Sequence, residues 1–117
     1  MKNEKLYQMS FESIYALYIQ KAIRKSRTKE EVDQIIFWLT GHNDETLKKV
    51  LEDKITLQDF FNQAPKINEN SPLITGVVCG VRVEEIKDPL MQKIRYLDKL
   101  IDELSKGKRI EKILRKS

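Results

Sequence analysis

Residues 27–41 read RTKEEVDQIIFWLTG and carry the clearest helix signals in the chain. Thr28 and Glu31 have the spacing of a capping box, in which each side chain satisfies a backbone N–H group at the start of a helix. The apolar residues that follow share one helical face: Val32, Ile35, Ile36 and Leu39. Gly41 suits the left-handed backbone position that ends a helix. We therefore expect a helix between Thr28 and Gly41.

Three further helices are predicted before and after this stretch. Ser10 can cap a helix that runs from about 11 to 25, because its side chain can accept a hydrogen bond from the first turn. Asn43 can cap the next helix in the same way. Thr56 can cap a short helix that Pro65 ends, since the residue before a proline disfavours helical geometry.

The longest predicted helix begins at Asp88, with Pro89 in the first helical position, where its missing N–H is harmless. Its apolar residues alternate in spacing between four and three, as in a coiled-coil seam: Leu90, Ile94, Leu97, Ile101 and Leu104. So short a seam favours a helix in the core of a bundle, with homodimerisation as the alternative to a monomer. A basic helical tail is expected from about residue 107.

The segment 73–87 fits two structures. Ser71-Pro72 and Asp88-Pro89 both resemble helix starts, and they favour a helix between them. The alternation of apolar residues from Val77 to Val83 instead fits a strand, and valine is a strand-favouring residue. The sequence leaves this choice open, although we expect the helix.

Together these patterns predict a single domain over residues 1–117 with an all-α fold, a compact bundle of about five to seven helices. The alternative is an α+β fold with a small strand or hairpin at 74–86. The helices at 28–41 and 90–104 are expected at its centre, with Trp38, Phe60 and Phe61 completing the core.

Composition narrows the functional classes. Cys79 is the only cysteine, so no internal disulfide can form, and no cluster of cysteine and histidine is present to hold a metal. The chain has neither a signal-peptide pattern nor the roughly 20 consecutive apolar residues that a membrane span requires. We therefore expect a cytoplasmic protein without a cofactor or a membrane partner.

Positive charge is concentrated in two blocks, although the net charge is only +4. The first block covers residues 21–29 and the second covers residues 106–116. If the blocks share one surface, they could neutralise several phosphates of a nucleic acid. The candidate nucleic-acid-binding residues are Lys21, Arg24, Lys25, Lys112, Arg115 and Lys116. In the alternative interpretation, these cations only offset the negative ends of helix dipoles.

Arg82 is the most unusual charged residue, because it lies in an otherwise apolar run and a buried arginine must be paired. Glu85 lies one helical turn away, and Arg95 belongs to a polar face of the last helix. Arg82, Glu85 and Arg95 are therefore candidate ligand-binding residues for a small anion or a peptide end. A structural salt-bridge network is the alternative.

His42 and Cys79 are the remaining candidates for chemistry. His42 could act as a general base, but a residue that contacts carbonyls at a helix end is the favoured interpretation. Cys79 could act as a nucleophile, but a catalytic thiol needs an activating base, and nothing in the sequence places His42 beside it. A small buried cysteine is therefore expected, and no catalytic residue is assigned.

Four strings carry a resemblance to a known family: Tyr7-x-Met9-Ser10-Phe11 and the segments 27–41, 73–86 and 88–104. Over nearly its whole length the chain resembles an uncharacterised bacterial family, domain of unknown function 2200. The resemblance implies a small bacterial protein. It implies no activity, cofactor or site residue.

Three functional classes follow. The first is a non-enzymatic binding or interaction protein, whose partner is another protein or a small ligand. The second is a nucleic-acid-associated protein that uses the blocks 21–29 and 106–116. The third is a small enzyme with a polar pocket around Arg82, which would show side chains with displaced pKa values in a cleft.

Overall fold

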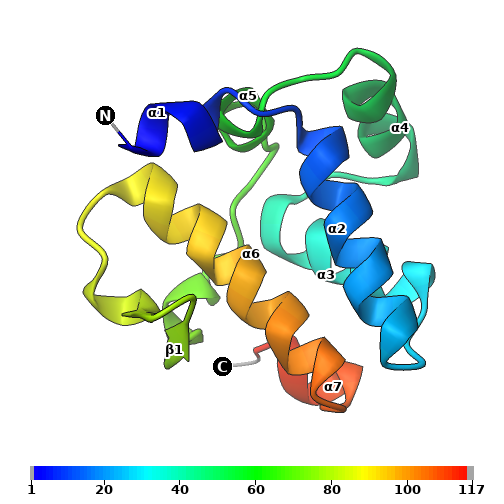
Figure 1. Ribbon diagram of the computed structural model, residues 1–117, viewed down its shortest axis with the longest axis vertical. Coiled ribbons are helices and arrows are strands. Elements are labelled where there is room, and N and C mark those ends of the chain that lie inside the picture. The colour runs from blue at the N-terminus through cyan, green and yellow to red at the C-terminus, as the bar shows by residue number, and fades with distance from the viewer. Residues whose placement is uncertain (1, 116–117) are drawn as a thin grey trace.

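The computed structural model describes residues 2–115, and most of them are helical (Figure 1). The α-helices are α1 (Lys2–Tyr7), α2 (Phe11–Arg24), α3 (Lys29–Thr40), α4 (Asp44–Glu52), α5 (Leu57–Asn62), α6 (Pro89–Ser105) and α7 (Ile110–Ile113). Between α5 and α6 lie two 3-10 turns, Ser71–Leu73 and Val83–Glu85, and the strands β1 (Val77–Val78) and β2 (Val81–Arg82). The predicted all-α fold is confirmed. In the described residues, no helix is long and apolar enough to cross a membrane.

The predicted helix ends form largely as expected. Thr28 Oγ1 accepts a hydrogen bond from the Glu31 N–H, and the Glu31 carboxylate accepts one from the Thr28 N–H, which completes the capping box. Gly41 ends α3 with φ of +77°. Side chains also cap four other helices, at Ser10, Asn43, Thr56 and Asp88. Local sequence therefore sets where α2, α3, α4, α5 and α6 begin.

The predicted helix over 73–87 is wrong, and the hairpin alternative is what the chain forms. β1 and β2 pair antiparallel. Cys79 and Gly80 make the two-residue turn with φ of +52° and +77°, and such turns match the twist of the two strands. Gly76 also has positive φ, which a continuous helix does not allow. Ser71 caps no helix and instead lies buried in a 3-10 turn.

Helices α2 and α6 run side by side in the same direction, toward the same end of the molecule (Figure 1). Three side-chain hydrogen bonds join residues 80 or 81 positions apart: Tyr7 to Asp88 (2.7 Å), Tyr18 to Asp98 (2.5 Å) and Lys21 to Asp102 (3.3 Å). A constant separation requires that the two segments run parallel. Burial, followed by the charge of Asp98, raises the pKa of Tyr18 well above its ordinary value, so its hydroxyl remains a donor.

The core lies between α2, α3 and α6, which contact one another. The rings of Phe11 and Phe60 stack with centroids 3.8 Å apart, and Phe61 meets Phe60 edge-on. Phe60 and Phe61 are buried as predicted. Trp38 is only partly buried and packs against the edge of the core, so its predicted role as a core residue is confirmed only in part.

Gly41 brings the loop 65–70 against the end of α3. A Cβ atom there would lie only 3.0 and 3.1 Å from the backbone N and O atoms of Lys66. The close approach lets Lys66 N–H donate to the Thr40 carbonyl and Asn68 N–H donate to the Leu39 carbonyl. The loop thereby satisfies carbonyls that the end of a helix otherwise leaves unpaired.

Replacing Gly41 with alanine should destabilise the fold more than the same change at Gly80, which has the same φ but where an added Cβ atom would meet nothing within 4 Å. Gly80→Ala should cost about 1 kcal/mol, the ordinary cost of a left-handed alanine. Gly41→Ala should cost about 1–3 kcal/mol more, because the loop must move. Urea denaturation of both variants measures the difference, and equal losses would contradict tight packing of the loop.

Candidate functional site

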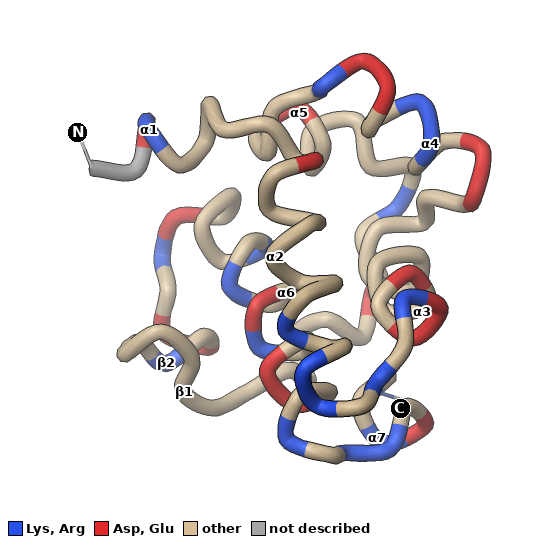
Figure 2. Tube along the Cα trace, turned by 45° about the vertical axis from the view of Figure 1, so that its right-hand side comes forward, with Lys and Arg blue, Asp and Glu red and all other residues tan. Residues whose placement is uncertain are grey.

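The two basic blocks meet at one end of the molecule. Figure 2 shows Lys and Arg gathered where α2 ends and where the α6–α7 loop and α7 lie. We call the residues 21–29 and 106–115 the basic end. The helices that carry them are in contact, since α6 packs against both α2 and α7, and α7 packs against α3.

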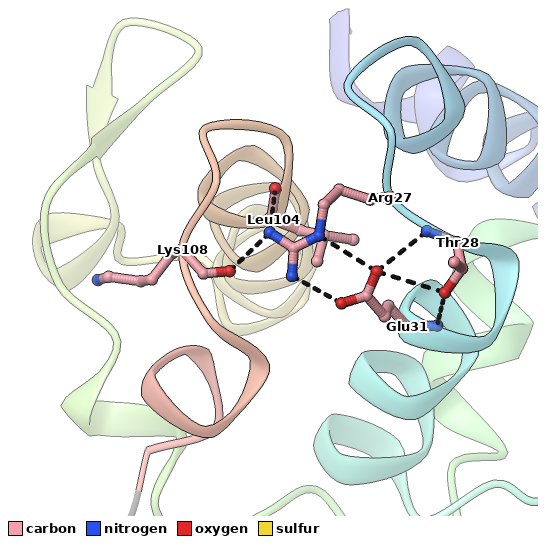
Figure 3. Close-up of polar contacts among 5 residues, drawn as sticks. All are labelled: Arg27, Thr28, Glu31, Leu104 and Lys108. Atoms are coloured by element: carbon pink, nitrogen blue, oxygen red, sulfur yellow. Dashed lines mark hydrogen bonds and ion pairs between the residues drawn. The ribbon is translucent and has the colours of Figure 1, made fainter.

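Arg27 joins the two blocks directly (Figure 3). Its Nη1 donates to the carbonyl oxygens of Leu104 (3.1 Å) and Lys108 (2.8 Å). Its Nε and Nη2 donate to the two carboxylate oxygens of Glu31, at 3.1 and 2.6 Å. One guanidinium group therefore connects the start of α3 to the end of α6. A cation is favourable there, because the final carbonyls of a helix carry partial negative charge.

Glu31 is the carboxylate partner of Arg27 in this contact between the two blocks. Its hydrogen bond from Arg27, together with that from the Thr28 N–H, lowers its pKa despite partial burial. Glu31 therefore stays ionised, so one carboxylate both caps α3 and orients Arg27.

The candidate cations divide into two groups. Lys21 pairs with Asp102, and Arg115 makes a bidentate pair with Glu103 at 2.6 and 2.7 Å while only 14% of its side chain is exposed. Three others are exposed and take part in none of the ion pairs between described residues: Arg24, Lys25 and Lys112. Lys116, the last candidate, lies outside the described residues.

The structure does not bring Arg82, Glu85 and Arg95 into one cavity. Arg82 lies on β2 with 51% of its side chain exposed, at 3.5 Å from Glu84 and 4.0 Å from Glu85. The expectation of a buried arginine is therefore wrong, because the hairpin turns this residue toward solvent. Arg95 instead donates to Asp98 at 2.8 Å on α6, beside a shallow groove of about 170 Å³.

His42 and Cys79 also lie apart from the basic end. His42 is buried, with its ring stacked on Phe60 and its Nδ1 at 3.0 Å from Thr46 Oγ1. Cys79 lies exposed in the hairpin turn, so the expectation of a buried cysteine is wrong. In the part of the chain that the structure describes, no group of three His, Cys, Asp or Glu residues could hold a metal ion.

Sequence reasoning missed the connecting role of Arg27, although it counted the residue in the first block. The partners of Arg27 across the fold are backbone carbonyls 77 and 81 residues away. Any residue type supplies a carbonyl, so no sequence pattern could have identified them.

Comparison with known proteins places the chain among uncharacterised relatives. Residues 5–115 match the family model described as "Uncharacterized protein conserved in bacteria (DUF2200)". The chain is similar to the crystal structure of the uncharacterized protein SP1917, with 47% identity and a TM-score of 0.90 over 95% of this chain and 91% of the other. No curated protein matches the chain.

Replacing Arg27 with methionine should lower the free energy of unfolding by about 2–3 kcal/mol, because Glu31 and two carbonyls lose a charged donor. The matched change Arg24→Met, three residues earlier on an exposed side chain, should stay within about 0.5 kcal/mol of the wild type. Urea denaturation measures both. Equal losses of stability in the two variants would show that the hydrogen bonds of Arg27 stabilise the fold no more than an exposed cation does.

His42 should titrate below its ordinary pKa of 6.5, because burial disfavours the imidazolium while the Phe60 carbonyl only partly offsets that effect. The unfolded chain then takes up the proton first as the pH falls, so the fold should lose stability from about pH 6.5 downward. His42 is the only histidine, so its ring protons in a one-dimensional NMR titration report it directly. A pKa at or above 6.5 would contradict the burial.

Proposed function

The chain belongs to the uncharacterised bacterial family DUF2200, and we propose that it is a non-enzymatic binding protein whose basic end binds the phosphates of a nucleic acid. The proposal places the protein in the cytoplasm, where bacterial nucleic acid lies. It rests on the geometry of the basic end, since the family carries no known activity.

One observation carries the proposal: two basic blocks about 80 residues apart in sequence are held side by side by Arg27. Cations that only offset helix dipoles need no common surface, because each acts on its own helix. Binding of a phosphate backbone needs several cations close together, since each neutralised phosphate adds to the affinity through release of counterions.

The basic end also separates structural cations from available ones. Arg27 and Arg115 are mostly buried and hydrogen-bonded to carbonyls and carboxylates, which fixes the backbone beneath the surface. Arg24, Lys25 and Lys112 project from that backbone in exposed positions. Each can neutralise a phosphate without breaking an internal ion pair, so binding costs little stability.

Charge reversal at Arg24→Glu with Lys25→Glu should weaken binding of a fluorescently labelled nucleic acid by at least tenfold at low salt, measured by anisotropy. The affinity of the wild type should fall steeply with salt. The double variant should have a shallower slope in a plot of log affinity against log salt, by about 0.7–0.9 for each lost phosphate contact.

The matched control is Lys48→Glu with Lys49→Glu, which changes the net charge equally on α4, at the far end of the molecule from the basic end (Figure 2). Its affinity should stay near that of the wild type apart from a small long-range effect. An equal loss in both double variants would show that net charge alone attracts the nucleic acid and would contradict a specific surface.

A further inference from the structure

A second feature lies where the loop 65–70 folds over the end of α3, which is the opposite end of that helix from Arg27; Asn70 of this loop contacts Arg115 of the basic end. A cavity of about 370 Å³ opens there, which falls in the range of small-ligand sites, roughly 300–1,000 Å³. Its walls are Trp38, Gly41, Lys66, Asn68, Glu69 and Asn70. We call it the Trp38 pocket.

The Trp38 pocket is built on a fixed frame. The loop donates to three successive carbonyls of α3: Lys66 N–H to Thr40, Asn68 N–H to Leu39, and the Asn68 side chain to Trp38. The Asn68 side chain also accepts from the Asn70 N–H at 2.8 Å. These bonds hold the pocket open before any ligand arrives, which reduces the ordering that binding requires.

Several polar groups of the walls remain available. Lys66 and Glu69 are exposed, and neither takes part in an ion pair between described residues. Asn70 donates through its Nδ2, but its Oδ1 accepts no hydrogen bond from the described residues. A cavity lined by an aromatic residue together with amide, ammonium and carboxylate groups suits an unpaired nucleobase, which proteins recognise by stacking and by hydrogen bonds to its edge.

The pocket is joined to the second basic block. Asn70 Nδ2 donates to the carbonyl of Arg115 at 3.2 Å, and Arg115 follows α7 in the chain. A ligand suited to both features carries negative charge and an exposed ring that can lie against Trp38. Single-stranded nucleic acid has both, whereas the bases of a duplex are stacked and paired inside it.

We infer that the Trp38 pocket receives a base of single-stranded nucleic acid whose phosphates lie on the basic end; this inference rests on the proposed function. Trp38 stacks on the base, and Lys66, Glu69 and Asn70 face its polar edge. Specificity for single strands then comes from the pocket, while most of the salt dependence comes from the basic end.

Trp38 is the only tryptophan of the chain, so its fluorescence reports the pocket alone. A single-stranded oligonucleotide of about ten nucleotides, the length that one small binding domain covers, should quench this emission. An abasic strand with the same phosphates should bind by anisotropy without quenching, and so should the matching duplex. A mononucleotide should quench only at much higher concentration, because it lacks the phosphates that hold a strand on the basic end.

Trp38→Leu should weaken binding of the single strand about tenfold, the scale of one lost base stack, and leave duplex binding unchanged. Trp38→Phe should restore most of the affinity, because phenylalanine keeps an aromatic face. Phe37→Leu is the matched control, since Phe37 is the neighbouring partly buried aromatic on α3 and does not line the pocket; its single-strand affinity should equal that of the wild type. Circular dichroism confirms that each variant folds.

The outcomes separate the two claims. Salt-dependent binding with unchanged emission overturns the base pocket and leaves the proposed function in place. Failure of both single strand and duplex to bind contradicts the proposed function itself. Quenching by a mononucleotide as strong as that by the strand overturns the single-strand assignment in favour of a free nucleotide. Quenching by the base-bearing strand alone, lost with charge reversal at Arg24 and Lys25, supports both.

Discussion

The guanidinium group of Arg27 fixes the α2–α3 turn against the end of α6 and the loop that follows it. It lies between the Glu31 carboxylate, which caps α3, and the carbonyls of Leu104 in the last turn of α6 and Lys108 in the loop that follows, and it donates hydrogen bonds to both sides. The planar guanidinium group presents its N–H donors in fixed directions, so it can bind both oxygens of a carboxylate and backbone carbonyls at the same time. The ammonium group of a lysine lacks this fixed geometry. The end of α6, the loop after it and α7 are thereby fixed against the α2–α3 turn, and the surface cations take their positions from that backbone.

Much of the helical framework could be predicted from the sequence because its signals are local. Thr28, Glu31 and Gly41 act within a few residues of one another, and the α6 seam repeats within one helix. The structure of segment 73–87 could not be predicted, since its proline signals favour a helix and its valine alternation favours a strand. Gly76 and Gly80 adopt positive φ there, which fits the hairpin and not a helix. The sequence identified the charged blocks but not their contact, which depends on backbone carbonyls far along the chain.

The basic end and the Trp38 pocket each combine side chains that are bonded within the protein with side chains that are free to contact a ligand. In each, some side chains form hydrogen bonds within the protein while others remain available: Arg27 and Arg115 are bonded internally in the basic end, and Asn68 is bonded internally in the wall of the cavity. Such internal bonding matters because a binding surface that is already ordered loses less entropy when its ligand arrives. The pocket was not identified from sequence, since Trp38 was expected in the core and the hydrogen bonds that place the loop 65–70 against α3 go to backbone carbonyls, which any residue type supplies.

The parallel course of α2 and α6 has a consequence for the synthesis of the protein. Tyr7, Tyr18 and Arg27 all bond to partners 77 to 81 residues later in the chain. When α2 and α3 leave the ribosome, these partners have not yet been made, so the first helices must wait with one apolar face uncovered. The fold can close only when residues near 108 have emerged, so folding of this small helical protein depends on contacts between residues that are distant in sequence.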